Sequence, residues 1–291
     1  MSVFEGTVFE RTNEAWVIEP QREGARARAV ELWRYRRLLW FLAVRTVKDL
    51  YEGMSLGIFW LFARPLLPIL VGGFVFGGLL GLPSDGVPYV LFFMTGFVSW
   101  SLFDRSLLFG TRCLDRHKGL IKRLYFPRLI SPVAGVAPAA AYFVIYVVLM
   151  AVVASFYLWK DGVLYVQVGP TLLVAVLMAA FAVFCALSVV LFTCVFQARH
   201  KETRFGLRYF TQFWMYLTPV FYPISVVPPE HRWLIYINPM APVVATFRWG
   251  ILGVGEVPLV PLATSFAIAV VAMAAGIWFF TANEASTVDR L

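Results

Sequence analysis

The sequence predicts an all-α polytopic membrane protein. Hydrophobic residues make up 60% of its 291 residues and charged residues only 14%, a composition far from that of a soluble globular domain. Several windows of about 20 residues carry almost no charge, and a helix of that length crosses a hydrocarbon core of about 30 Å. The apolar runs are continuous, whereas the strands of a membrane β-barrel alternate at period two.

Residues 30–52 are predicted to form an amphipathic helix. Charged residues such as Arg34 and Arg45 recur on one side at helical spacing, and Trp33 and Trp40 lie on the other. Because Trp and Arg are interleaved, we expect this helix to lie along the membrane surface. The polar residues 1–29 precede it.

Six transmembrane helices are expected to follow. They lie near residues 56–81, 88–110, 129–156, 168–196, 209–227 and 257–281. Residues 231–252 are apolar but contain Asn238-Pro239 and Pro242, and proline disfavours one continuous helix. We therefore expect a re-entrant outer hairpin of two short helices before the last span, and a tail at 282–291.

Lys and Arg are unevenly distributed among the connecting segments. There are nine in residues 1–55, six in 111–128 and four in 197–208, but none in 82–87. Basic loops face the cytoplasm, so a multi-pass protein with both termini in the cytoplasm is predicted. The +8 formal charge is explained by this topology without nucleic acid as a partner.

Motifs for enzymatic chemistry are missing. No Gly-x4-Gly-Lys-Ser/Thr loop for ATP is found, the three cysteines have no metal-binding spacing, and the three histidines lie in different loops. We therefore expect no enzyme activity, no metal site and no cofactor in this chain.

Charges within spans are few: Arg64 and Asp104-Arg105 could reach the interface or pair with neighbours.

The loop at residues 112–128 is predicted to be a short amphipathic helix that docks on a cytoplasmic partner. Leu114, His117 and Ile121 share one face of it. The alternative is a solvated positive loop.

Aromatic residues within the spans either pack in the usual way or line a passage for sugars, since rings stack on the C–H faces of pyranoses. The candidates for the passage are Trp60, Phe93, Phe97, Trp100, Phe103, Tyr209, Phe213, Trp214 and Tyr216.

Several segments resemble the permease subunit of ABC-2-type polysaccharide exporters, which move O-antigen, capsule, teichoic acid or galactan. The segments, in order, are Leu56-Gly57-Ile58-Phe59-Trp60, Arg64-Pro65-Leu66-Leu67, Pro88-Tyr89 with Gly96 and Trp100, residues 120–128 (LIKRLYFPR), residues 218–223 (TPVFYP), Asn238-Pro239-Met240 and Phe247-Arg248-Trp249. The stretches 45–52 and 197–202, and Arg64, depart from the family's pattern.

The resemblance implies a type V exporter-like homodimer of six-span subunits, with residues 56–281 as the transmembrane domain, paired with two ATP-binding subunits that hold ATP and Mg²⁺. It places a coupling helix in 112–128, a gate helix at 30–52 and an outer cap at 231–252. The coupling residues would be Asp115, His117, Ile121, Lys122, Arg123, Tyr125, Phe126 and Pro127. Arg34, Arg37, Arg45 and Lys48 would attract a lipid pyrophosphate, and Phe221, Tyr222, Trp233 and Tyr236 would form an outer gate.

The resemblance thus implies the transmembrane channel of an ATP-driven transporter in the bacterial inner membrane that exports a polyprenyl-pyrophosphate-linked polysaccharide. An ABC-2 permease for a drug or small lipid stays open as an alternative. An integral-membrane glycan-modifying enzyme is a second alternative, which the missing acidic or metal-binding pair disfavours.

Overall fold

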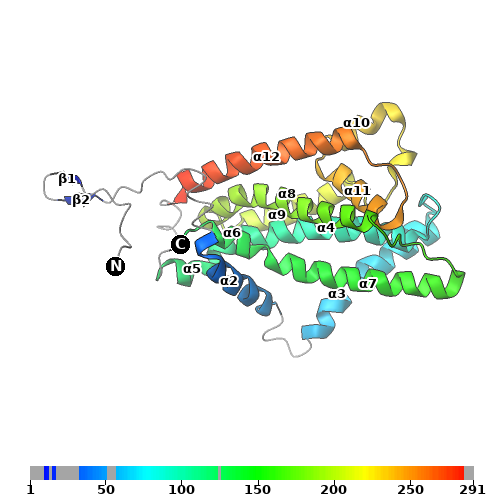
Figure 1. The fold of residues 1–291 in the computed structure, drawn as a ribbon, viewed down its shortest axis with the longest axis horizontal. Coiled ribbons are helices and arrows are strands. Elements are labelled where there is room, and N and C mark those ends of the chain that lie inside the picture. The colour runs from blue at the N-terminus through cyan, green and yellow to red at the C-terminus, as the bar shows by residue number, and fades with distance from the viewer. Residues whose placement is uncertain (1–9, 13–14, 18–32, 51–56, 124–125, 285–291) are drawn as a thin grey trace.

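The computed structural model describes residues 10–12, 15–17, 33–50, 57–123 and 126–284, and within them the side chains of residues 10–12, 15–17, 57, 58, 60, 61 and 64, which include Trp60 and Arg64, are not described. The helices form an elongated bundle (Figure 1), with α2, α5 and α6 at one end and α10 at the other. The first is called here the α5 end and the second the α10 end. The only strands among these residues are β1 (Glu10–Thr12) and β2 (Ala15–Val17), an antiparallel pair that was not predicted from the sequence.

The helices follow the predicted order. They are α2 (Arg36–Lys48), α3 (Gly57–Gly72) with the π-helical η1 (Gly73–Leu79), α4 (Tyr89–Thr111), α5 (Cys113–Ile121), α6 (Ile130–Gly135), α7 (Ala137–Asp161), α8 (Thr171–Arg199), α9 (Thr203–Leu217), η2 (Ile224–Val226), η3 (Pro229–His231), α10 (Arg232–Tyr236), α11 (Met240–Leu252) and α12 (Leu259–Ala282). Local signals explain several ends. Gly162 and Gly253 have positive φ directly after α7 and α11, the usual way to terminate a helix.

Three apolar stretches in the described part of the chain are long enough to cross a membrane: residues 130–161 (α6 and α7), α8 and α12. The helix α4 is 23 residues long but carries Asp104 and Arg105. Residues 65–79 and α11 are shorter apolar helices. These observations identify a helical membrane protein, and the count of six spans stays a prediction.

The predicted fifth span, 209–227, is placed differently in the structure. The helix α9 begins at Thr203 and ends at Leu217, and residues 218–223 form a turn. Pro219 and Pro223 have no backbone N–H to donate and restrict the residue before them, so the helix cannot continue through them. At 15 residues, α9 alone is only about 22 Å long.

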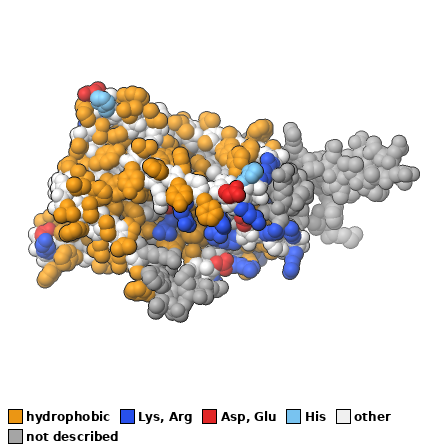
Figure 2. All heavy atoms as spheres, turned by 180° about the vertical axis from the view of Figure 1, so that it is seen from behind, with side chains coloured by type: hydrophobic (Ala, Val, Ile, Leu, Met, Phe, Trp, Pro, Cys, Tyr) orange, Lys and Arg blue, Asp and Glu red, His pale blue; other side chains and the backbone are white. Residues whose placement is uncertain are grey.

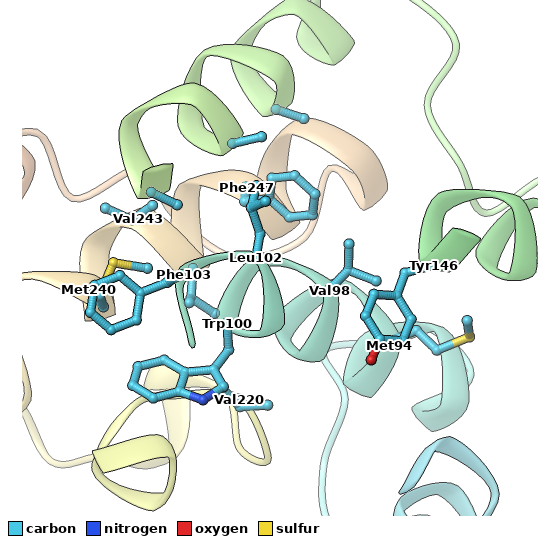
Figure 3. Packing of buried hydrophobic residues seen from close by; sticks show 14 of the residues in the cluster. Met94, Val98, Trp100, Leu102, Phe103, Tyr146, Val220, Met240, Val243 and Phe247 are labelled. Atoms are coloured by element: carbon cyan, nitrogen blue, oxygen red, sulfur yellow. The ribbon is translucent and has the colours of Figure 1, made fainter. Parts of the chain in front are cut away.

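The centre of the bundle is α4, which packs against α7, α8 and α11. Figure 3 shows Leu102 and Phe103 of α4 directed towards Phe247 and Met240 of α11, and Trp100 directed towards Val220, all within one continuous hydrophobic core. A second core lies at the α5 end and joins α2, α5, α6, α8 and α12. All three cysteines of the chain are buried and unpaired.

Candidate functional site

The helix α5 is held tightly by its own chain. Cys113, Leu114, His117 and Ile121 are buried on its inner face. The three apolar ones belong to the second core, together with Leu42 of α2, residues of α8 and Phe280 of α12. Gly135 of α6 touches it closely, because a β-carbon there would lie 2.7 Å from that of Cys113. A movement of α5 must therefore displace the helices that pack against it.

The structure divides the predicted coupling residues into two groups. His117, Ile121 and Phe126 are buried and Pro127 is half-buried, whereas Asp115, Lys122 and Arg123 are exposed. Tyr125 lies outside the described residues. The exposed group, with Lys118, is the face that a partner can reach, while Phe126 belongs to the second core. Truncation of Phe126 would thus disturb how α5 is held and not its outer face.

A buried amide connects α5 to α9. Gln197, near the end of α8, is 1% exposed. Its Nε2 donates to Asp115 Oδ2 at 3.1 Å, and its Oε1 accepts from the backbone N–H of Arg204 at 3.0 Å. One side chain therefore joins the first turn of α5 to the first turn of α9. In the sequence alone, residues 197–202 stand out only as a departure from the family's pattern.

His117 connects α5 to α2. The Thr46 hydroxyl donates to the Leu42 carbonyl at 2.6 Å, so its oxygen accepts from His117 Nε2 at 3.5 Å. Within the described residues, His117 Nδ1 is buried without a hydrogen-bond partner. Burial, with Arg116 and Arg45 nearby, lowers the pKa of His117 from 6.5 to about 4. The imidazole is therefore neutral at physiological pH.

Acid is expected to loosen the contact between α5 and α2. A histidine with a pKa of about 4 when buried takes up a proton near pH 6.5 when released, so its contribution is complete above pH 6.5 and is lost as the pH falls towards 4. The full difference is on the order of 3 kcal/mol. Hydrogen exchange of both helices, corrected for intrinsic rates, should rise between pH 7.5 and 4.5. In His117→Gln this rise should be much smaller, and an equal rise in both proteins would contradict the assignment to His117.

The basic residues predicted on α2 and just before it are all accessible. Arg34, Arg37, Arg45 and Lys48 are exposed, while Leu42 and Thr46 on the opposite face are buried. Arg45 and Lys48 lie in the last turn of α2, where positive charge is favourable. The helix thus presents a cationic face at the α5 end.

The predicted passage aromatics separate into a buried and an exposed set. Phe93, Trp100 and Phe103 of α4 are at most 3% exposed and Phe97 is half-buried. Trp100 and Phe103 pack edge-on against the half-buried Trp214. By contrast, Tyr209, Phe213 and Tyr216 of α9 are 65%, 76% and 59% exposed. Among the candidates whose side chains the structure describes, which leaves out Trp60, the α9 set alone is exposed.

The exposed face of α9 also carries polar residues that were not predicted from the sequence. Arg204, Arg208 and Gln212 are exposed and spaced four apart, so they form a line beside the aromatic one. The buried Thr211 lies next to Arg208, on the side of α9 away from the aromatic line. The spacing could have revealed this line, but the predicted span began at residue 209 and excluded both arginines.

At the α10 end, three side chains from different elements hold the turn at residues 218–223. Nη2 of the buried Arg248 donates to the carbonyls of Pro219 and Val220 at 2.9 and 3.1 Å. The Tyr89 hydroxyl donates to the Phe221 carbonyl at 2.7 Å, and Asn238 Nδ2 donates to Thr218 Oγ1 at 2.7 Å. The backbone carbonyls of Pro219, Val220 and Phe221, which have no helical partners after α9 ends, thus each accept a hydrogen bond.

The predicted outer-gate residues differ in their exposure. Phe221 is buried and stacks on Tyr216 with ring centroids 5.2 Å apart, Tyr222 and Tyr236 are half-buried, and Trp233 is exposed. The expected pair of short helices is present as α10 and α11, separated by residues 237–239. Whether the pair is re-entrant stays a prediction. In the described ranges, no group of three or more His, Cys, Asp or Glu residues could hold a metal ion.

Comparison with known proteins identifies the family. Residues 37–252 match the model of the ABC-2 type transporter family. An O-antigen export system permease protein RfbA of Myxococcus xanthus is 26% identical over 221 residues, 75% of this chain and 81% of the relative. The RfbA of Klebsiella pneumoniae is 26% identical over 210 residues, 71% and 78% of the two chains. The inner membrane transport permease YadH of Escherichia coli K12 is 41% identical over 56 residues, 19% and 21%. With helices long enough to cross a membrane and a family match over most of its length, this chain belongs to the ABC-2 type transporter family.

Proposed function

We propose that this chain is the transmembrane channel subunit of an ATP-driven exporter for a polyprenyl-pyrophosphate-linked polysaccharide. In this proposal two copies, each with six spans, assemble with two ATP-binding subunits that hold ATP and Mg²⁺. The α5 end faces the cytoplasm of a bacterial cell and the α10 end faces outward. Relatives named as O-antigen export permeases support this substrate class.

The exposed face of α9 is the observation that carries the proposal. Aromatic rings suit the apolar faces of sugars, and the neighbouring Arg208 and Gln212 can bond to hydroxyl and acidic groups. An exposed arginine and amide are unfavourable against lipid. This face is therefore expected to meet a second copy across a wetted passage.

The other features fit steps of the same transport cycle. The cationic face of α2 attracts the pyrophosphate of the lipid carrier at the cytoplasmic surface. The exposed residues of α5, among them Lys122 and Arg123, meet the ATP-binding subunit. Movement of α5 then reaches α9 through Gln197.

Gene depletion followed by radiolabelling of lipid-linked glycans tests the proposal. Full-length polymer should accumulate inside the cell, whereas short or absent polymer would indicate a glycan-modifying enzyme. An unchanged profile would favour export of a drug or small lipid.

A triple substitution of Tyr209, Phe213 and Tyr216 by alanine tests the passage itself. It should reduce export more than tenfold, because the three rings that no longer stack on a sugar together weaken binding by on the order of 3 kcal/mol. The control is alanine at Phe266 and Trp278, which are exposed on α12 and are expected to face lipid. Equal export by both variants would contradict a role for the α9 face.

A further inference from the structure

Two charged residues of α4, Asp104 and Arg105, lie well inside the bundle. Both are half-buried and precede the end of α4 at Thr111 by six or seven residues, roughly 10 Å along the axis. Charges at such depth are costly in a membrane and usually mark a functional site.

Arg105 points into the bundle and not towards the α5 end. Its guanidinium lies 3.8 Å from the ring centroid of Tyr142 on α7, and Nη2 donates to the Tyr146 hydroxyl at 2.9 Å. Tyr146 is nine residues into α7, which begins at Ala137, or about 13 Å from that helix's start. An arginine reaching for the interface would extend in the opposite direction.

Among the described residues, no carboxylate lies within salt-bridge distance of Arg105. The ion pairs in the described part of the chain include Arg128 with Glu284 and His231 with Glu230, and neither pair is near Arg105 in the sequence. The planes of two tyrosines fix the guanidinium, and the nearby Asp104 interacts with it electrostatically without forming a close ion pair. A positioned cation of this kind is suited to an external anion.

Asp104 precedes Arg105 on α4, which packs against α9. Its carboxylate interacts electrostatically with Thr211 and Arg208 of α9 and with Arg105. We call Asp104, Arg105, Tyr146, Arg208 and Thr211 the polar strip. Its two arginines outnumber its one carboxylate, so its net charge is positive. Figure 2 shows Lys and Arg side chains reaching from the α5 end well into the hydrophobic surface.

We propose that the polar strip is a transit site for the phosphate group of an anionic lipid-linked substrate on its way through the bundle. This inference rests on the proposed function. Arg105 and Arg208 donate to the phosphate oxygens, as guanidinium groups do with charge assistance, and Tyr146 positions Arg105. Asp104 weakens the attraction, and a site on a conduction path must release what it binds.

Binding of a radiolabelled polyprenyl pyrophosphate to the full-length permease in phosphatidylcholine nanodiscs tests the site. Arg105→Gln and Arg208→Gln should each weaken binding about tenfold, the size expected for loss of one charge-assisted hydrogen bond. The control is Arg112→Gln, at an exposed arginine just past the end of α4, which should change binding less than twofold. Wild-type affinity in Arg105→Gln would overturn the site.

Asp104→Asn gives a prediction of opposite sign that a misfolded protein cannot mimic. Binding should tighten several-fold because the opposing carboxylate is gone, and unchanged or weaker binding would overturn the transit role. Competition by phosphatidylglycerol as strong as that of unlabelled substrate would also overturn it, because the site would then bind lipid headgroups in general. If the wild-type permease fails to bind the probe at all, the proposed function itself fails. If it binds but Arg105→Gln binds equally, only the polar strip fails.

Discussion

Replacing Gln197 by leucine is expected to reduce ATP-driven export about tenfold while the ATP-binding subunit still assembles and hydrolyses ATP. The substitution keeps the side-chain size but removes the bonds to Asp115 and to the backbone N–H of Arg204. The core packing that holds α5 stays in place, so the docking face is retained. Coupling energies between sites are typically about 1–3 kcal/mol, and a tenfold loss lies within that range.

Two substitutions at Asp115 serve as controls for this link. Asp115→Ala removes the acceptor and should reproduce the loss of export, whereas Asp115→Asn keeps an oxygen that can accept from Gln197 and should retain most of it. Export and ATP hydrolysis are measured together in proteoliposomes containing the whole transporter. Normal export by Gln197→Leu would show that movement of α5 reaches α9 by another route.

Replacing Arg248 by leucine is expected to lower the melting temperature of the purified permease by on the order of 5–10 °C. The carbonyls of Pro219 and Val220 would lose their donor, and an unsatisfied buried acceptor costs about 1–3 kcal/mol. The stacking of the guanidinium on Phe92 at 3.7 Å would also disappear. Removal of a buried charge offsets part of this cost, which leaves a net loss of about 2–4 kcal/mol.

Two further variants separate the role of Arg248 from a general effect of removing arginine. Arg232→Leu is the matched control, because this half-buried arginine donates to the Val227 carbonyl at the edge of the bundle, and its loss should change melting little. Gly96→Ala tests the packing of Arg248 from α4, since a β-carbon there would lie 2.5 Å from Arg248 Nη2. Its destabilisation should be smaller in an Arg248→Leu background. Additive effects of the two substitutions would argue against direct contact.

The sequence predicted those elements whose signals are local. The helix predicted at 30–52 from a 3.6-residue period is present as α2 (Arg36–Lys48), with residues 30–32 and 51–52 outside the described part of the chain. The break between α10 and α11 follows from Asn238-Pro239. The end of α9 also has a local cause in Pro219 and Pro223, but the path of the chain beyond it depends on distant residues. Val220 and Phe221 continue the apolar run, so composition extends the span through them, but Arg248 draws the backbone into a turn.

The candidate site was only partly predictable for the same reason. The apolar residues of α4 surround the whole helix, so no period distinguishes the buried Phe93 and Trp100 from an exposed set. The short helix α5 was predicted, but which of its faces packs on the chain depends on α2, α8 and α12. The Gln197 link joins residues far apart in sequence and leaves no local pattern.

The burial of all three cysteines makes the natural chain a ready background for thiol chemistry. Cys113, Cys185 and Cys194 are shielded within the bundle, so a water-soluble maleimide applied to the folded protein meets few competing sulfurs. Single cysteines introduced on the exposed faces of α9 or α12 could then be labelled or cross-linked in intact membranes without first removing the native ones. The proximity of two copies and the side that each helix presents to water become measurable on an otherwise unaltered transporter.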